Sequence, residues 1–81
     1  MSLQRLSEEE LRAAHRAIRF VARNPGAGEI VPLTQYEFDP SLPHPCTQLI
    51  WSVRPGRRLA LYFEVQGGIL EVYFVKAFYQ L

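Results

Sequence analysis

The stretch that decides the fold is WSVRPGRRLALYFEVQGGILEVYFVKAF, residues 51–78. It contains runs rich in β-branched, aromatic and aliphatic residues, separated by two short turn signals. Pro55-Gly56 suits the central positions of a type II turn, and Gly67-Gly68 is a strong signal for a two-residue hairpin. Together with the apolar run that begins at residue 47, this stretch predicts an antiparallel β-meander over residues 47–78.

Residues 7–24, which precede this region, are predicted to form one helix. Ser7 followed by Glu10 is the pattern of a capping box, and Asn24-Pro25-Gly26 ends the helix. Apolar residues recur at helical spacing along one side, and four arginines line the opposite side: Arg12, Arg16, Arg19 and Arg23. This arginine stripe has two interpretations. It is either a solvated face, paired in part with the glutamates of the first turn, or a ridge that contacts phosphate groups or a partner.

The intervening segment, residues 25–46, is predicted to be irregular because it holds five of the six prolines. Within it, residues 31–38 are expected to form a short strand, which Pro32 confines to the edge of the sheet. The 81 residues are expected to form a single domain. The predicted class is α+β, with an N-terminal helix packed on an antiparallel meander of three to four strands.

Strand alternation predicts which side chains share a face of this sheet. The greasier face is expected to lie under the helix and comprises Ile50, Leu59, Leu61, Phe63, Val65, Leu70, Val72 and Phe74. The other face mixes aromatic, aliphatic and charged residues: Leu49, Trp51, Val53, Arg58, Ala60, Tyr62, Glu64, Glu71, Tyr73, Val75 and Ala77. This mixed face is too apolar to be left in water and too polar for an ordinary core. Either the proline-rich segment folds across it, or a homodimer mate, a partner peptide or an RNA strand covers it.

Composition narrows the classes of function. The net charge of +1 argues against a strong, non-specific nucleic-acid binder, although residues 25–46 carry only acids and the flanking regions are locally basic. The single cysteine, Cys46, permits no internal disulfide, which is typical of a reducing compartment. No apolar run is long enough to span a membrane, and the first residues lack the pattern of a signal peptide. A cytoplasmic location is therefore expected.

Four short motifs then suggest a family. They are NPGAG at 24–28 after the helix, WSVR at 51–54, RLALYF at 58–63, and ILEVYFVK at 69–76. Their order and spacing resemble those of the RelE/ParE superfamily, the toxin components of type II toxin–antitoxin systems, including its HigB-like branch. The resemblance covers roughly residues 10–78.

This resemblance implies a toxin that an antitoxin protein neutralises by wrapping around it. RNA-cleaving members of the superfamily cut mRNA at the ribosome without a metal or other cofactor, whereas ParE members inhibit DNA gyrase. By resemblance, Arg54, Arg58 and Lys76 stabilise charge at the scissile phosphate, and Tyr79 corresponds to a C-terminal tyrosine. The chain departs from the pattern after Lys76, where the usual basic residues are missing, and at Ser52, where an acidic residue is common.

Cleavage of RNA also needs groups that carry protons. His15 lies inside the predicted helix, and His44 with Cys46 supplies too few ligands for a metal site. Trp51, Tyr62 and Tyr73 are predicted binding residues, because they suit either base stacking or a protein interface. Two functions therefore stay open: an mRNA endoribonuclease, and a non-catalytic protein-interaction module, or decayed family member, that forms homodimers or heterodimers through the sheet face.

Overall fold

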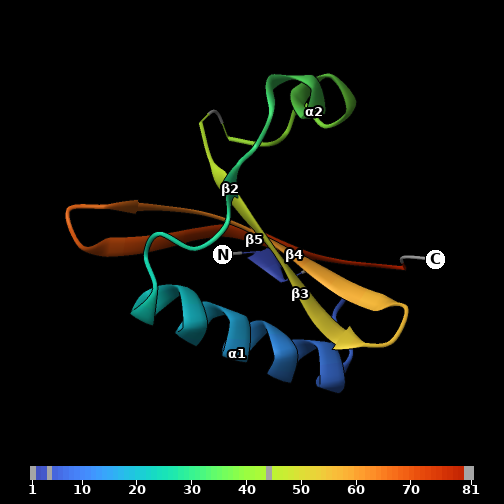
Figure 1. Cartoon of the computed structure of the whole chain (residues 1–81). Helices are drawn as coiled ribbons and strands as arrows, with labels where there is room; N and C mark the ends of the chain where they lie inside the picture. The colour runs from blue at the N-terminus through green and yellow to red at the C-terminus, as the bar shows by residue number, and fades with distance from the viewer. Residues whose placement is uncertain (1, 4, 44, 80–81) are drawn as a thin grey trace.

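The structure is a computed structural model and describes residues 2, 3, 5–43 and 45–79; His44 lies outside the described residues. Along the chain the elements are β1 (Ser2–Leu3), α1 (Glu8–Arg23), β2 (Glu29–Ile30), α2 (Leu33–Phe38), β3 (Thr47–Arg54), β4 (Arg57–Gln66) and β5 (Ile69–Tyr79). The strands form one sheet in the order β1-β5-β4-β3-β2. Strands β2 to β5 are antiparallel, and the predicted α+β class is confirmed. The two helices lie on opposite sides of the sheet (Figure 1).

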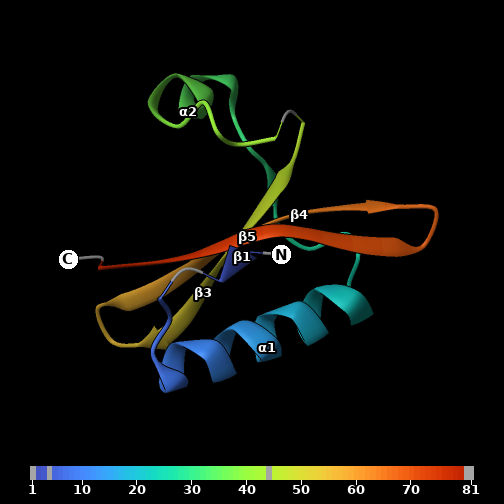
Figure 2. The ribbon, with the colours of Figure 1, turned by 180° about the vertical axis from the view of Figure 1, so that it is seen from behind.

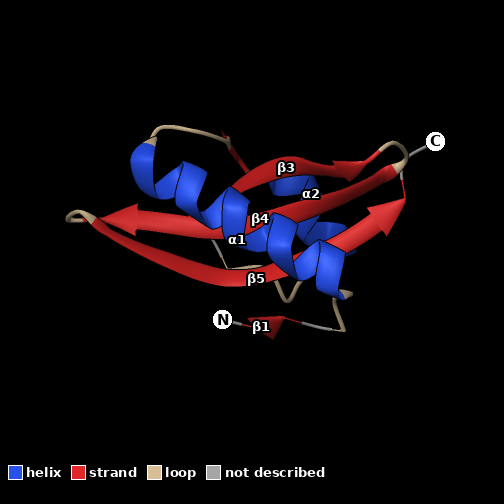
Figure 3. Cartoon of the chain, turned by 90° about the horizontal axis from the view of Figure 1, so that it is seen from below, coloured by secondary structure: helices blue, strands red, loops and turns tan. Residues whose placement is uncertain are grey.

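Helix α1 forms where the capping pattern predicts it. The Ser7 hydroxyl accepts a hydrogen bond from the backbone N–H of Glu10 at 3.1 Å, and the Glu10 carboxylate accepts one from the backbone N–H of Ser7 at 2.9 Å. Three glutamates in the first turn and Arg23 in the last have the charges that the helix dipole favours. Viewed from the side of α1, the helix lies across β3, β4 and β5 (Figure 3).

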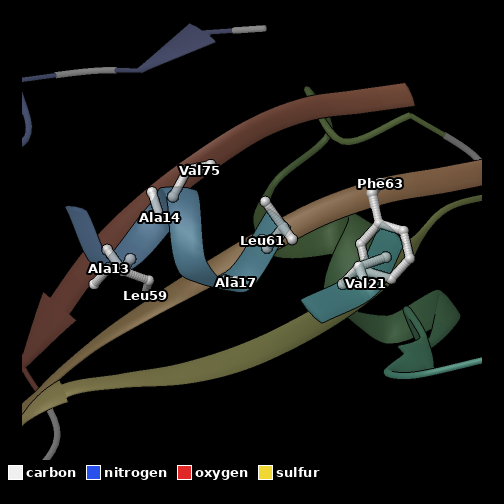
Figure 4. Close-up of a cluster of buried hydrophobic side chains, with 8 residues drawn as sticks. All are labelled: Ala13, Ala14, Ala17, Val21, Leu59, Leu61, Phe63 and Val75. Carbon is white, nitrogen blue, oxygen red and sulfur yellow. The ribbon is translucent and has the colours of Figure 1, made fainter. Parts of the chain in front are cut away.

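The main core lies between α1 and the sheet (Figure 4). Leu59, Leu61 and Phe63 of β4 point at the helix and are fully buried, as alternation predicts. The helix meets them with small side chains at Ala13, Ala14 and Ala17. Burial of each large side chain contributes about 1.5–3 kcal/mol, so this layer holds the helix and the meander together.

A β-bulge near the end of β3 changes which of its side chains face the helix. Ser52 pairs with Arg58 while Arg54 pairs with Arg57, so Val53 is an extra residue in the ladder. One extra residue moves every earlier side chain of the strand to the opposite face. Consequently Leu49, Trp51 and Val53 pack against the α1 core, and Ile50 does not. The predicted placement of these four residues is therefore wrong.

A second bulge has the same effect in β5. Tyr62 pairs with Phe74 and Phe63 pairs with Val72, which leaves Tyr73 as the extra residue. The two-residue Gly67-Gly68 turn is present as predicted, and both glycines have positive φ. Beyond the bulge, however, each side chain of β5 lies on the face opposite to the predicted one. Val75 and Ala77 lie under the helix, whereas Phe74 lies on the far side, which corrects the predicted face of all three.

The segment between α1 and β3 contains a helix where a strand was expected. Residues 33–38 form α2, with Pro32 at the N-cap (φ −67°), a position where its missing N–H costs nothing. The edge strand is instead the short β2, whose Glu29 and Ile30 pair with Gln48 and Thr47. At the opposite edge, β1 runs parallel to β5 beside Phe74 and Val75, a strand that sequence reasoning missed (Figure 2).

Candidate binding site on the outer face of the sheet

The face of the sheet away from α1, here called the outer face, is built from alternate residues of three strands. Its members are Gln48, Ile50 and Ser52 of β3, Arg58, Ala60, Tyr62 and Glu64 of β4, and Glu71, Phe74, Lys76 and Phe78 of β5. The two bulges shape this set, because they turn Gln48, Ser52 and Lys76 away from the apolar core. The face is therefore a mixture of aromatic, small and charged side chains.

One half of the outer face is covered by the chain itself. Val31, Leu42 and Cys46 are buried there in a second apolar cluster with Ala60 and Tyr62. One of the predicted alternatives therefore holds for this half: described residues of the proline-rich segment fold across the sheet. Figure 1 shows α2 of this segment on the side of the sheet opposite α1.

Polar contacts fix this segment in place. The Gln35 amide donates to the Tyr62 hydroxyl at 3.1 Å, and the Tyr36 hydroxyl donates to the carbonyl oxygen of Pro43 at 2.9 Å. The Tyr36 oxygen also lies 3.6 Å from the Cys46 sulfur. Burial raises the pKa of Tyr62, so this phenol keeps its proton at neutral pH and acts as a hydrogen-bonding group.

The other half of the outer face is open. Ile50, Ser52 and Arg58 are exposed, and Ile50 shows 43% of its surface to solvent. A groove of about 370 Å³ runs between this open half and α2. Its lining residues are Gln35, Gln48, Ile50, Ala60, Tyr62, Lys76, Ala77 and Phe78. The open half thus presents an apolar floor next to cationic groups.

The two cations of the outer face differ in their surroundings. Lys76 forms an ion pair with Asp39, and this contact, with a further hydrogen bond from Ser41, lowers the pKa of Asp39. The Lys76 ammonium also lies 5.3 Å from the centre of the Phe74 ring. Arg58, by contrast, has no ion pair with any described residue. Arg58 is therefore the cation available to an incoming carboxylate or phosphate.

The remaining predicted catalytic residues lie on the helix side. Arg54 pairs with Glu9 of α1 at 2.7 Å, and Tyr79 lies under the Arg57 guanidinium, 4.2 Å from its carbon to the ring centre. The structure thus brings Arg58 and Lys76 onto one face but separates them from Arg54 and Tyr79. The four predicted catalytic side chains do not meet at one point.

The predicted binding residues are also divided. Trp51 packs under α1, with its ring centre 5.4 Å from that of Phe20, whereas Tyr62 belongs to the outer face. Tyr73, at the bulge, donates a hydrogen bond to Glu64 at 2.6 Å. That hydrogen bond, with burial and the charge of Glu64, raises the pKa of Tyr73 to about 12. Tyr73 thus packs against the second apolar cluster on the outer face, as Tyr62 does, but it is not among the residues that line the groove.

Sequence reasoning missed one ion pair that organises the helix side. Arg57 Nε lies 2.5 Å from Glu10 Oε2, and both side chains are largely buried. The hydrogen bonds from Ser7 and Arg57 lower the pKa of Glu10. The signal was the capping box itself, because a capping glutamate has a second carboxylate oxygen free to accept from a neighbouring strand.

The chemistry of the outer face is that of a binding surface. Its described part contains two cations, two carboxylates, a neutral phenol and apolar groups, while His15 is exposed on α1, on the other side of the sheet. Among the described residues, no group of three His, Cys, Asp or Glu side chains is arranged so that it could hold a metal ion. Neither helix in the described part of the chain is long and apolar enough to cross a membrane.

Comparison with protein-family models, with curated proteins and with solved structures finds no match to this chain.

Proposed function

We propose that the chain binds a protein partner through the open half of the outer face, and that it is a toxin-like component whose partner is an antitoxin. The observation that carries the proposal is the groove beside Ile50, where a branched aliphatic side chain on the outer face is 43% exposed next to the open edge of β3. Exposed apolar surface of this kind, rimmed by polar groups, marks interaction sites. The antitoxin is inferred from the resemblance to RelE/ParE toxins.

The surroundings of the groove define the chemistry of this partner. Three further large apolar side chains are exposed on the neighbouring β2–α2 segment: Ile30 at 76%, Leu33 at 72% and Phe38 at 88%. Arg58 offers a guanidinium that forms no ion pair with a carboxylate of the described residues. The partner is therefore expected to present an apolar segment that carries at least one acidic side chain.

The edge of β3 favours an extended segment as the bound element. β2 pairs with β3 only at Thr47 and Gln48, so no described strand pairs with the outer edge of residues 49–54. Unpaired N–H and C=O groups at a sheet edge accept an added strand, and the side chains alongside provide specificity.

The test is a titration with the protein encoded by the reading frame next to this gene, which the proposal expects to be a small antitoxin-like protein. Ile50→Glu is expected to weaken binding about 30-fold or more, as loss of a central apolar contact does. Ile69→Glu is the matched control, because Ile69 is the same residue type, 71% exposed, beside the distant Gly67-Gly68 turn. Calorimetry measures both affinities.

Equal binding by the two variants would contradict the proposal, and so would a neighbouring protein that does not bind at all. Light scattering of the unmodified chain separates a further outcome. A dimer that Ile50→Glu dissociates would mean that a second copy of this chain, and not a different protein, covers the groove.

A second candidate, an mRNA endoribonuclease, is favoured by one observation: Arg58 and Lys76 lie on one face together with Tyr62. Two cations beside a groove suit the stabilisation of charge on a phosphate. In this case only the outer-face part of the predicted catalytic set acts on the RNA.

The endoribonuclease function predicts which substitutions lower the rate of RNA cleavage. Cleavage of ribosome-bound message is expected to fall about 100-fold in Arg58→Gln, the loss typical when one stabilising donor is removed. Arg54→Gln is expected to change the rate little, because Arg54 pairs with Glu9 on the helix side. Gel analysis of the message after incubation measures both rates. Intact message at high protein concentration would exclude the activity, and equal losses in both variants would contradict the outer-face assignment.

A further inference from the structure

A second charged surface lies on the opposite side of the molecule, along the exposed face of α1. Each of the three glutamates in the first turn has its own arginine: Glu8 pairs with Arg12 at 3.4 Å, Glu9 with Arg54 at 2.7 Å and Glu10 with Arg57 at 2.5 Å. Residues 11–24 contain no acidic residue. The positive charge of the second half of α1 is therefore left without a counterpart.

Three arginines make up this surface, here called the arginine ridge: Arg16, Arg19 and Arg23. All three are exposed, and none forms an ion pair with a described residue. At 3.6 residues per turn they fall within an arc of roughly 60°, and at 1.5 Å per residue they span about 10 Å along the helix. The ridge is thus a short line of cations on the face of α1 opposite its buried residues.

Helix stability explains only part of the ridge. Arg23 is the basic residue of the last turn, where a cation stabilises the helix through its dipole. That effect fades within one turn, so it does not account for Arg16 or Arg19. Neither residue has a glutamate four positions away to pair with along the helix.

An aromatic side chain borders the ridge. Phe20 follows Arg19 directly and is 40% exposed, while the other side of its ring contacts Trp51. A fixed, half-exposed ring next to a line of arginines is the combination that binds single-stranded nucleic acid: the guanidinium groups contact phosphates and the ring stacks on a base.

We propose that the arginine ridge, with Phe20, binds the phosphate backbone of a single strand of nucleic acid. All three residues of the ridge are arginines, and the planar guanidinium group of arginine can donate two hydrogen bonds at once to phosphate oxygens. This site is separate from the partner-binding groove, because the whole sheet lies between them, and so the two proposals stand or fall independently.

The test measures anisotropy of fluorescently labelled oligo(U) and oligo(dT) as the full chain is added at increasing potassium chloride. Three phosphate contacts predict a slope of about −2 for log affinity against log salt concentration. Arg16→Gln/Arg19→Gln is expected to lower the affinity at low salt about tenfold and to reduce the slope to about −0.7. Arg23 is retained so that the helix end is unaffected, and circular dichroism verifies the fold.

The control is Arg5→Gln/Arg54→Gln, which removes the same charge from residues outside both the ridge and the outer face. It is expected to leave the affinity within about twofold, because Arg5 is exposed and lies outside the ridge, and Arg54 already pairs with Glu9. Phe20→Leu keeps an apolar contact with Trp51 and is expected to weaken binding about fivefold through lost stacking. Stronger binding of oligo(U) than of oligo(dT) would identify RNA as the preferred strand, and equal binding would show that the backbone phosphates are the shared feature.

Three results would overturn the proposal: no binding at low salt, a larger loss in the Arg5→Gln/Arg54→Gln control than in the ridge variant, or displacement of the oligonucleotide by polyglutamate of equal charge at equal concentration. The last result would make the ridge a site for an acidic protein.

Discussion

At the scale of single residues, Glu10 connects the start of α1 to the sheet. One carboxylate oxygen accepts a hydrogen bond from the backbone N–H of Ser7, and the other accepts a hydrogen bond from Arg57 Nε. The side chain is buried, with 5% of the residue exposed. A buried carboxylate is tolerated only when it is fully paired, and here it closes the helix cap and binds β4 at once.

Glu10→Gln separates these two roles, because glutamine also completes a capping box but cannot form the ion pair. We expect a loss of about 2 kcal/mol in the free energy of unfolding, since Arg57 keeps a largely buried charge without a partner. Glu9→Gln is the control, because its pair with Arg54 is about half exposed and its loss is expected to cost less than about 1 kcal/mol. Urea unfolding near pH 7 measures both, and equal losses would contradict this role for Glu10.

Glu10 also makes the free energy of unfolding depend on pH. The pKa of Glu10 is lowered in the folded state by the hydrogen bonds from Ser7 and Arg57. The unfolded chain therefore binds the proton more tightly, and stability falls as the pH drops from the ordinary value of about 4.5 through the folded pKa. The stability difference between the unmodified chain and Glu10→Gln is expected to be full near pH 7 and to shrink near pH 3. A difference that stays constant would contradict the ion pair.

At the scale of elements, the turns and the helix were predictable, but the faces of two strands were not. The ends of α1 are marked by the capping box of Ser7 and Glu10 and by Asn24, and the hairpin is fixed by Gly67-Gly68. These signals could be predicted because they are local in the sequence. The bulges at Val53 and Tyr73 depend on tertiary packing. The sequence nevertheless held a sign of the bulges. Regular alternation would bury the polar side chains of Gln48, Ser52 and Lys76 in the apolar core under the helix, and one extra residue in each strand moves them to the outer face.

The residues of the candidate site could likewise be placed on the correct face only where the strand contains no bulge. Arg58 and Tyr62 were predictable on the outer face, because β4 is regular between the turns. Trp51 was placed there wrongly, since its face depends on the bulge. The α2 helix was missed because its six residues contain three β-formers and follow a proline, a pattern that resembles an edge strand. Its hydrogen bond from Gln35 to Tyr62 is a tertiary contact that the sequence does not reveal.

Gly28 controls the path of the chain from α1 to β2. Its φ is +89°, and a Cβ at this position would lie 2.6 Å from the carbonyl oxygen of Gln48. Gly28→Ala is expected to destabilise the protein by about 2 kcal/mol or more, because it adds a backbone clash to the cost of positive φ. Gly26→Ala is the control: a Cβ there meets open space, and the change is expected to be near neutral or slightly stabilising. Thermal unfolding of both variants measures the difference, and a neutral Gly28→Ala would show that β2 is not held against β3.

At the scale of the whole molecule, the sheet separates two surfaces of different chemistry. α1 covers one side, and α2 lies on the other (Figures 1 and 2). The exposed face of α1 carries the arginine ridge, and the groove lies beside α2 on the outer face. The net charge of +1 conceals this division. A protein partner in the groove and a nucleic acid on the ridge would not compete for space.

The central claim is that the open half of the outer face binds a protein partner. Nuclear magnetic resonance of the ¹⁵N-labelled chain, titrated with the protein from the neighbouring reading frame, tests it most directly. We predict that the amide signals of residues 49–54, Arg58 and Phe78 shift most, while those of Arg16, Arg19 and Arg23 stay in place. Shifts confined to α1, or no shifts at saturating partner, would contradict the claim.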